Sequence, residues 1–323
     1  MRPVSDERVT PDAAPPAPPW KEAGGSRAQA NAEETPFQRI VADFAASRIA
    51  LAGLVLFAVI LAAALFAPLL SPQNPYDLAQ LDVMDSRLAP GAQAADGKFT
   101  YWLGTDDQGR DMLSAIFYGL RISIGVGVAS TLCALAIGTT LGLLAAFFGG
   151  RVDSFIMRVA DIQLSFPAIL IALILLAVLG QGVDKIIVAL VAVQWAYYAR
   201  TVRGSALVER RKEYIDAAAC LALPTRRIVF RHLLPNCLPP LIVVATVQVA
   251  AAITLEATLS FLGLGLPITE PSLGLLISNG FTYLLSGKYW ISFFPGIALL
   301  ATIVSINLVG DQLRDVLNPR LQR

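Results

Sequence analysis

The chain has 323 residues, of which 55% are hydrophobic and only 15% are charged. Soluble domains carry about 25% charged residues, so this composition argues against an ordinary soluble domain and predicts a membrane protein. The net charge of +1 is too small to indicate a nucleic-acid partner.

Residues 1–46 differ in composition from the rest of the chain. They are rich in proline, alanine and small polar residues, as in "PDAAPPAPPWKEAGGSRAQANAEETP", and such a segment cannot bury enough apolar surface to fold alone. We therefore predict a disordered tail. The first apolar run starts near Ile49, too late for a secretory signal, so it is predicted to be an uncleaved anchor.

Six segments are predicted to cross the membrane. A bilayer core about 30 Å thick needs about 20 apolar helical residues, and five segments are long enough: Ile49–Leu70, Ile122–Phe148, Ile162–Val183, Leu238–Leu266 and Tyr289–Gly310. Ile186–Ala199 is shorter and, by itself, also fits a buried or re-entrant segment. Lys185 and Arg200 flank it and can reach the interface, so we count it as a span over about residues 184–203.

The distribution of lysine and arginine predicts the orientation. Six spans put both termini on one side, and 19 of the 25 cationic residues fall on that side. Cytoplasmic loops carry such an excess. Both termini, including the tail at 314–323, and the polar segment Glu213–Asn236 are therefore predicted to be cytoplasmic. The chain is predicted to be a multi-pass membrane protein, surrounded by lipid.

Residues 47–118 then hold the first span and an extracytoplasmic segment. This segment ends in a turn of charged and glycine residues, which either orders the outer surface or only caps the next helix: Asp106, Gly109, Arg110 and Asp111. In the second span, Gly138 and Gly142 form a small-xxx-small pair, which predicts close helix packing.

The sequence lacks the usual parts of a catalytic site, and we predict no enzyme activity. The single histidine, His232, cannot build a Ser–His pair within the membrane or a zinc protease motif, which needs two histidines. No phosphate-binding G-x-x-x-x-G-K-[ST] loop is present, so any ATP used must be bound by another subunit. Cys133, Cys220 and Cys237 lack metal-ligand spacing, and no metal site is predicted.

Three polar residues within the spans are candidates for a translocation path. Glu256 is the clearest, because a carboxylate there must face protein or water. It either lines the path or fixes helix packing through hydrogen bonds. Gln248 and Asn307 have the same two possible roles. An ion-coupled carrier usually shows several such groups or broken helices, so it fits poorly.

The segment Glu213–Asn236 is predicted to form two short helices. In "EYIDAAACL", Tyr214, Ala217, Ala218 and Leu221 fall on one helix face, and the alanines would let a partner approach closely. After Pro224, Thr225 can cap a second helix, "RRIVFRHLL", which Pro235, Pro239 and Pro240 are expected to end. A simple amphipathic lipid-surface hairpin is the alternative.

This segment resembles the EAA loop of ABC importer permeases, and most closely that of the dipeptide and oligopeptide permease family. The similar parts are "EYIDAA" and "IVFRHLLPN", together with "GTDDQGRDMLSAIFYGLRISIGVG", "EATLSFLGLG" and "FPGIALLATIVSINLVGDQLRDVLNPR". The resemblance covers about residues 48–320. It implies an all-α fold with six transmembrane helices of the type I importer permease, in which residues 119–313 form the ABC transmembrane domain.

The resemblance also implies the function and partners. The chain would import dipeptides or oligopeptides by alternating access, with a second homologous permease, two cytoplasmic ATPases and an extracytoplasmic solute-binding protein. It would bind no cofactor, and the ATPases would use ATP and Mg²⁺. The implied ATPase-coupling residues are Glu213, Tyr214, Asp216, Ala217, Ala218, Leu221, Ala222, Leu234 and Pro235. Import of nickel or another small solute, an ion-coupled carrier and a non-transporting scaffold remain as alternatives.

The loop departs from the family pattern at four positions. Ala222 replaces the usual loop glycine, Ala219 a basic residue and Asp216 the loop glutamate, while Asn318 stands where aspartate is common. Alanine has fewer backbone choices than glycine. We expect Pro224 to enforce the turn instead and coupling to be retained.

Overall fold

The structure is a computed structural model that describes residues 36–317 except 78, 80, 96, 98 and 268. The predictions for residues 1–35, for Asn318 and for the rest of the C-terminal tail lie outside this part. The chain divides into two units, Met1–Ala46 and Ser47–Arg323. In the first, Pro36–Ala46 forms helix α2. The disorder predicted for the whole of residues 1–46 is wrong there, because Ile40, Val41 and Phe44 recur at helical spacing in a stretch free of glycine.

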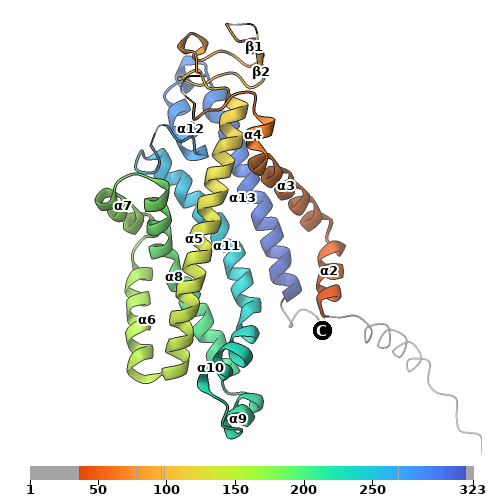
Figure 1. Ribbon diagram of the computed structural model, residues 1–323, viewed down its shortest axis with the longest axis vertical. Coiled ribbons are helices and arrows are strands. Elements are labelled where there is room, and N and C mark those ends of the chain that lie inside the picture. Colours follow the sequence, from red (N-terminus) through yellow and green to blue (C-terminus); the bar gives the residue numbers. More distant parts are fainter. Residues whose placement is uncertain are drawn as a thin grey trace, which may run out of the picture. The chain divides into compact units, whose positions relative to one another are not determined.

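The second unit is a bundle of helices, which confirms the all-α fold class (Figure 1). Its main helices are α3 (Arg48–Leu65), α4 (Ala67–Leu70), α5 (Met112–Phe148), α6 (Gly150–Ser165), α7 (Ala168–Leu179), α8 (Val183–Glu209), α9 (Glu213–Cys220), α10 (Thr225–Arg227), α11 (Leu234–Phe261), α12 (Leu273–Phe281) and α13 (Trp290–Leu317). Short 3-10 turns lie at Val83–Asp85 (η2) and Leu284–Ser286 (η4). The described strands, β1 (Ala92–Gln93) and β2 (Thr100–Tyr101), pair antiparallel.

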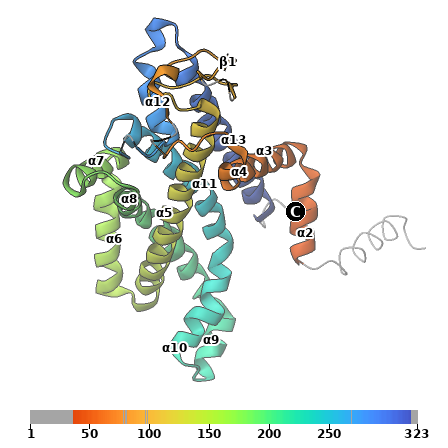
Figure 2. The same cartoon turned by 45° about the horizontal axis from the view of Figure 1, so that its top comes forward.

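Two views place the short helices α9 and α10 at one end of this unit, and the β1–β2 ribbon with α12 at the other (Figures 1 and 2). We call these the hairpin end and the ribbon end. Long helices connect the two ends. The apolar segments of the sequence therefore lie between the ends, and the polar segments lie at them.

Among the described residues, four helices are long and apolar enough to cross a membrane: Arg48–Leu65, Met112–Phe148, Thr225–Phe261 and Trp290–Leu317. The bent pair α6–α7 gives a fifth if it counts as one span. The predicted sixth span lies in α8, a 27-residue helix whose second half is polar. Crossing by α8 stays a prediction.

The segment Ile162–Val183, predicted to be one span, is not one continuous helix, and its crossing of the membrane stays a prediction. α6 ends at Ser165, α7 starts at Ala168, and the two helices bend by 94° at the break. Phe166 is extended, with φ −96° and ψ 145°, as expected for a residue that precedes a proline. α7 then ends at Leu179, where Gly180 takes φ 84°.

The helix end predicted at Pro235, Pro239 and Pro240 is also wrong. Thr225–Phe261 continues as one span through a π-helical stretch, η3 (Ile228–Leu233). There the N–H of Leu234 donates to the carbonyl of Val229, five residues back. Pro235 follows directly after this π-helical stretch, and membrane helices accept prolines when their surroundings satisfy the freed backbone groups.

Among the described helices, α5 and α8 share the most extensive contact, and it confirms the packing role predicted for the glycine pair. A Cβ added at Gly138 would stand 2.4 Å from the carbonyl oxygen of Trp195, and one at Gly142 would stand 2.5 Å from that of Ala199. Backbone therefore lies against backbone along this contact.

Gly142→Ala should lower the thermal unfolding midpoint of the purified protein. Replacing a mid-helix glycine by alanine normally stabilises by about 0.5–1 kcal/mol, but overpacking a tight contact costs about 1–3 kcal/mol. Gly125 on the same helix is the matched control, because its added Cβ would meet nothing within 4 Å. Gly125→Ala should be neutral or stabilising, and equal shifts for both variants would contradict this account of the contact.

Candidate functional site

The segment Glu213–Asn236, which we call the hairpin, holds the predicted coupling residues; it comprises α9, α10, η3 and the start of α11. Its helix α9 has a buried side and an exposed side. Ile215 and Ala218 are buried, with 7% and 5% of their surface exposed. Tyr214, Ala217 and Leu221 are exposed, and Leu221 reaches 75%. The single face predicted from Tyr214, Ala217, Ala218 and Leu221 is therefore wrong for Ala218. The apolar Ile215, three residues earlier, turns Ala218 toward the chain itself.

The other predicted coupling residues lie around this helix. Glu213, Asp216, Ala222 and Pro235 are exposed, and Leu234 is half-buried at the start of α11. The structure thus offers an exposed surface made of α9 and the turn after it. The small side chain of Ala217 is part of this surface.

Hydrogen bonds through Tyr214 tie α9 to two long helices. The Tyr214 hydroxyl donates to Oε2 of Glu209 at the end of α8 over 2.9 Å, and Nδ2 of Asn236 in α11 donates to the same hydroxyl over 3.1 Å. Partial loss of hydration at the hydroxyl and the neighbouring Glu209 carboxylate raise the pKa of Tyr214 to about 12, so this hydroxyl stays protonated near neutral pH. These two bonds connect α9 to the end of α8 and to the start of α11. The sequence analysis missed Glu209 and Asn236 as partners, since no local pattern pairs them with Tyr214.

Ala222 ends α9 in a strained conformation. Its φ is +52°, in the left-handed region where glycine is preferred. The N–H of Leu223 donates to the carbonyl of Ala218 over 3.3 Å, the six-to-one bond of a Schellman helix end, which commonly has glycine at this position. Pro224 does not relieve Ala222 of this conformation. It stands at the N-cap of α10 with φ −62°.

Ala222→Gly should therefore stabilise the end of α9. A left-handed residue with a Cβ costs about 1–2 kcal/mol, and the greater freedom of glycine in the unfolded chain offsets part of that gain. Amide hydrogen exchange in α9 should slow by roughly fivefold, which corresponds to about 1 kcal/mol. Ala217→Gly, in the middle of the same helix, should speed exchange. Faster exchange in Ala222→Gly would show that the turn needs its alanine.

Glu256 sits in a closed polar site between helices. Its side chain is fully buried, its Oε2 accepts a hydrogen bond from Ser123 of α5, and its Oε1 accepts one from Ser260, each over 2.8 Å. The surroundings are tight, since a Cβ added at Gly274 of α12 would stand 2.3 Å from the Ala257 carbonyl oxygen. This geometry favours the packing alternative, and a role of Glu256 in the path stays a prediction.

The structure does not bring the three path candidates together. Gln248 is 9% exposed and lies at the α8–α11 contact, where its backbone carbonyl accepts a bond from Nε2 of Gln194 over 3.0 Å. Asn307, by contrast, is exposed on α13. Only Asn307 among the three faces away from the described body of the second unit.

The turn Asp106–Asp111 is a buried structural unit at the ribbon end. Oδ2 of Asp106 accepts from Nε of Arg110 over 2.6 Å, with 0% and 1% of these side chains exposed. Oδ1 of Asp106 accepts the N–H groups of Gln108 and Arg110, each over 2.9 Å. The Asp111 carboxylate caps α5 by accepting the N–H of Ser114 over 2.8 Å.

Gly109 completes this turn. Its φ is +77°, and an added Cβ would stand 2.2 Å from the carbonyl oxygen of Asp82. These contacts support the ordering and capping alternatives together. An additional role in binding another protein stays a prediction.

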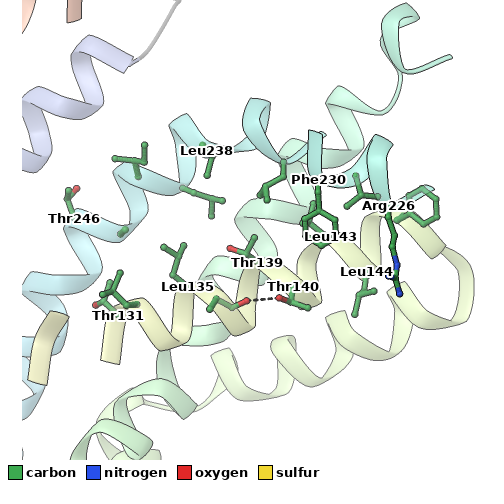
Figure 3. A pocket seen from close by; sticks show the side chains of 18 of the residues that line it. Thr131, Leu135, Thr139, Thr140, Leu143, Leu144, Arg226, Phe230, Leu238 and Thr246 are labelled. Carbon is green, nitrogen blue, oxygen red and sulfur yellow. Dashed lines mark hydrogen bonds between the residues drawn. The ribbon is translucent and has the colours of Figure 1, made fainter. Parts of the chain in front are cut away.

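An apolar groove of about 870 Å³ runs between α5 and the α10–α11 helix (Figure 3), and the sequence analysis missed it. Leucines, valines and phenylalanines make up more than half of its lining, threonines are the most frequent polar residues there, and Arg226 lies at the hairpin end. Its Thr140 hydroxyl donates to the Ala136 carbonyl of its own helix over 2.8 Å. The lining suits hydrocarbon or another apolar surface rather than the charged ends of a peptide.

Comparisons with known proteins agree with this architecture. Residues 138–323 match the family described as "Binding-protein-dependent transport system inner membrane component", and residues 35–90 match "N-terminal TM domain of oligopeptide transport permease C". The chain is 36% identical over 288 residues, 89% of its length and 93% of the relative's, to the "Di/tripeptide transport system permease protein DppC" of Pseudomonas aeruginosa (strain UCBPP-PA14). It is 37% identical over 280 residues, 87% and 88% of the two chains, to the "Oligopeptide transport system permease protein OppC" of Bacillus subtilis (strain 168).

A solved structure shares the fold. The MetNI methionine ABC transporter in an inward-facing conformation matches with a TM-score of 0.53 and 20% sequence identity, covering 64% of this chain and 98% of that one. At this identity the likeness concerns the fold alone.

Proposed function

The chain belongs to the family of binding-protein-dependent transport system inner membrane components, and from this premise we propose that it imports short peptides by alternating access, driven by separate ATPases. The chain is a non-enzymatic permease of the dipeptide and oligopeptide ABC importers in the inner membrane. Its mechanism, its assembly and its substrate are what we propose.

The observation that carries the proposal is the exposed side of α9. Ala217 and Leu221 offer a shallow contact, and the bonds of Tyr214 connect it to α8 and α11. In the proposed mechanism, ATP closes two cytoplasmic ATPases on each other, α9 follows them, and α8 and α11 move with α9. The path then opens toward an extracytoplasmic binding protein that delivers the peptide.

The proposed assembly contains this chain, a second homologous permease, the two ATPases and the binding protein, with both termini of this chain in the cytoplasm. ATP and Mg²⁺ belong to the ATPases. The names of the similar permeases favour dipeptides or oligopeptides as substrates. Nickel or another small solute is the second candidate, as the resemblance to the wider family implies.

Reconstitution tests the proposal. The complex is purified through a tag on this chain and placed in proteoliposomes with the binding protein, and uptake of a labelled dipeptide is measured with and without ATP. Uptake that needs ATP, an ATPase that copurifies and the binding protein is the expected result. Uptake driven by an ion gradient without an ATPase would establish a secondary carrier, and labelled nickel in place of the dipeptide tests the other substrate.

A further inference from the structure

The exposed side of α13 follows a regular seven-residue pattern. Between Ile291 and Leu313, the exposed positions are Phe293, Ile297, Leu300, Val304, Asn307 and Asp311. They are separated by alternating steps of four and three residues, the spacing that lines up one side of a helix against a second helix. We call these six positions the α13 seam.

Other sides of α13 are covered by this chain. The helix packs against α3, α11 and α12. Its Gly310 approaches α11 so closely that an added Cβ would stand 3.0 Å from the Thr246 hydroxyl oxygen. The seam therefore points away from the helices of the second unit, and Leu300 in it is 61% exposed.

Asn307 distinguishes the seam from an ordinary lipid-facing surface. It lies about one helical turn from the midpoint of α13, and it follows four exposed apolar residues of the seam. The Asn307 amide makes no hydrogen bond to any other residue that the structure describes. An amide in hydrocarbon without a partner is costly, whereas amides between membrane helices form hydrogen bonds that hold the helices together.

We propose that the α13 seam is the docking surface for a transmembrane helix of the second permease subunit, with a polar side chain of that helix bonded to Asn307. The inference rests on the proposed function, which supplies the second permease. Apolar side chains at four successive seam positions fit the knobs-into-holes contact of a helix. A lipid surface does not satisfy the amide, and a path for charged peptides does not call for a continuous apolar stripe.

Photo-crosslinking in the complete complex tests the contact. A benzophenone amino acid replaces Leu300, and in a control it replaces Ile174 of α7, which is 66% exposed. After illumination, the adducts are identified by mass spectrometry. We expect position 300 to be joined to a transmembrane segment of the second permease. An adduct only with lipid, with a labelled dipeptide or with an ATPase would overturn the seam.

The polar contact has its own test. Asn307→Leu should reduce the amount of second permease that copurifies by about three- to tenfold, the usual range for one interhelical hydrogen bond. Asn307→Gln, which keeps an amide, should lose less. Undiminished copurification in Asn307→Leu would contradict the proposed bond.

Failure of the seam and failure of the proposed function can be told apart. The wild-type complex is assayed for ATP-dependent dipeptide uptake before illumination. If uptake is intact while position 300 reaches only lipid, the seam alone is wrong. If uptake does not need ATP, the proposed function is wrong, whatever the adduct.

Discussion

Ala217→Trp should leave the protein folded in the membrane and yet abolish most ATP-driven uptake. Ala217 lies on the exposed side of α9, so an indole there adds bulk to the proposed ATPase contact and not to the chain's own core. Overpacking a close contact costs about 1–3 kcal/mol, which weakens binding roughly tenfold or more. The measurement is the amount of ATPase that copurifies, together with dipeptide uptake.

Two further variants make this result specific. Ala42→Trp, at an exposed alanine of α2, should change neither ATPase retention nor uptake. Ala218→Trp should instead destabilise the hairpin itself, because Ala218 is only 5% exposed. If Ala217→Trp retained the ATPase and transported at the wild-type rate, α9 would be a lipid-surface helix and not a coupling helix.

The second large effect is expected at the ribbon end, from Asp106→Ala. This change removes the partner of the buried Arg110 guanidinium and two backbone hydrogen bonds at once. Breaking one side of a buried ion pair typically costs about 3–5 kcal/mol. The variant should therefore lose its ordered Asp106–Asp111 turn, and limited proteolysis of the region between α4 and α5 should become fast.

An exposed ion pair provides the contrast. Asp184 and Lys185 also form a salt bridge, but their side chains are 71% and 38% exposed, and water screens such a pair. Asp184→Ala should leave both proteolysis and thermal stability close to wild type. Equal sensitivity of the two variants would mean that burial of the Asp106–Arg110 pair does not matter.

The sequence alone predicts those structural features that depend on a single segment of the chain. Long uncharged runs predicted the apolar helices, because length and hydrophobicity alone qualify a membrane span. The glycines at 138 and 142 predicted close packing for an equally local reason. The break at Phe166–Pro167 has a local signal too, since a residue before proline avoids the helical conformation, but the apolar run continues on both sides of it and favours a single span.

Other features depend on contacts that the sequence does not display. Ser123 meets Glu256 across 133 positions of the chain, so the closed site of this carboxylate was not predictable. The burial of Ala218 is not visible in the sequence, because both sides of α9 carry apolar residues and only the packing shows that Ile215 lies on the buried side. Pro239 and Pro240 were expected to stop a helix that the membrane setting allows to continue.

The contact of α5 with α8 limits how the protein can change shape. At Gly138 and Gly142, carbonyl oxygens of α8 occupy the space where side chains would stand, and a slide of one helix along the other by a residue would drive larger side chains into that space. Packed contacts of this kind resist gradual deformation. We therefore expect the two helices to move together as one body, and we expect any bending during a transport cycle at joints elsewhere, such as the 94° corner between α6 and α7.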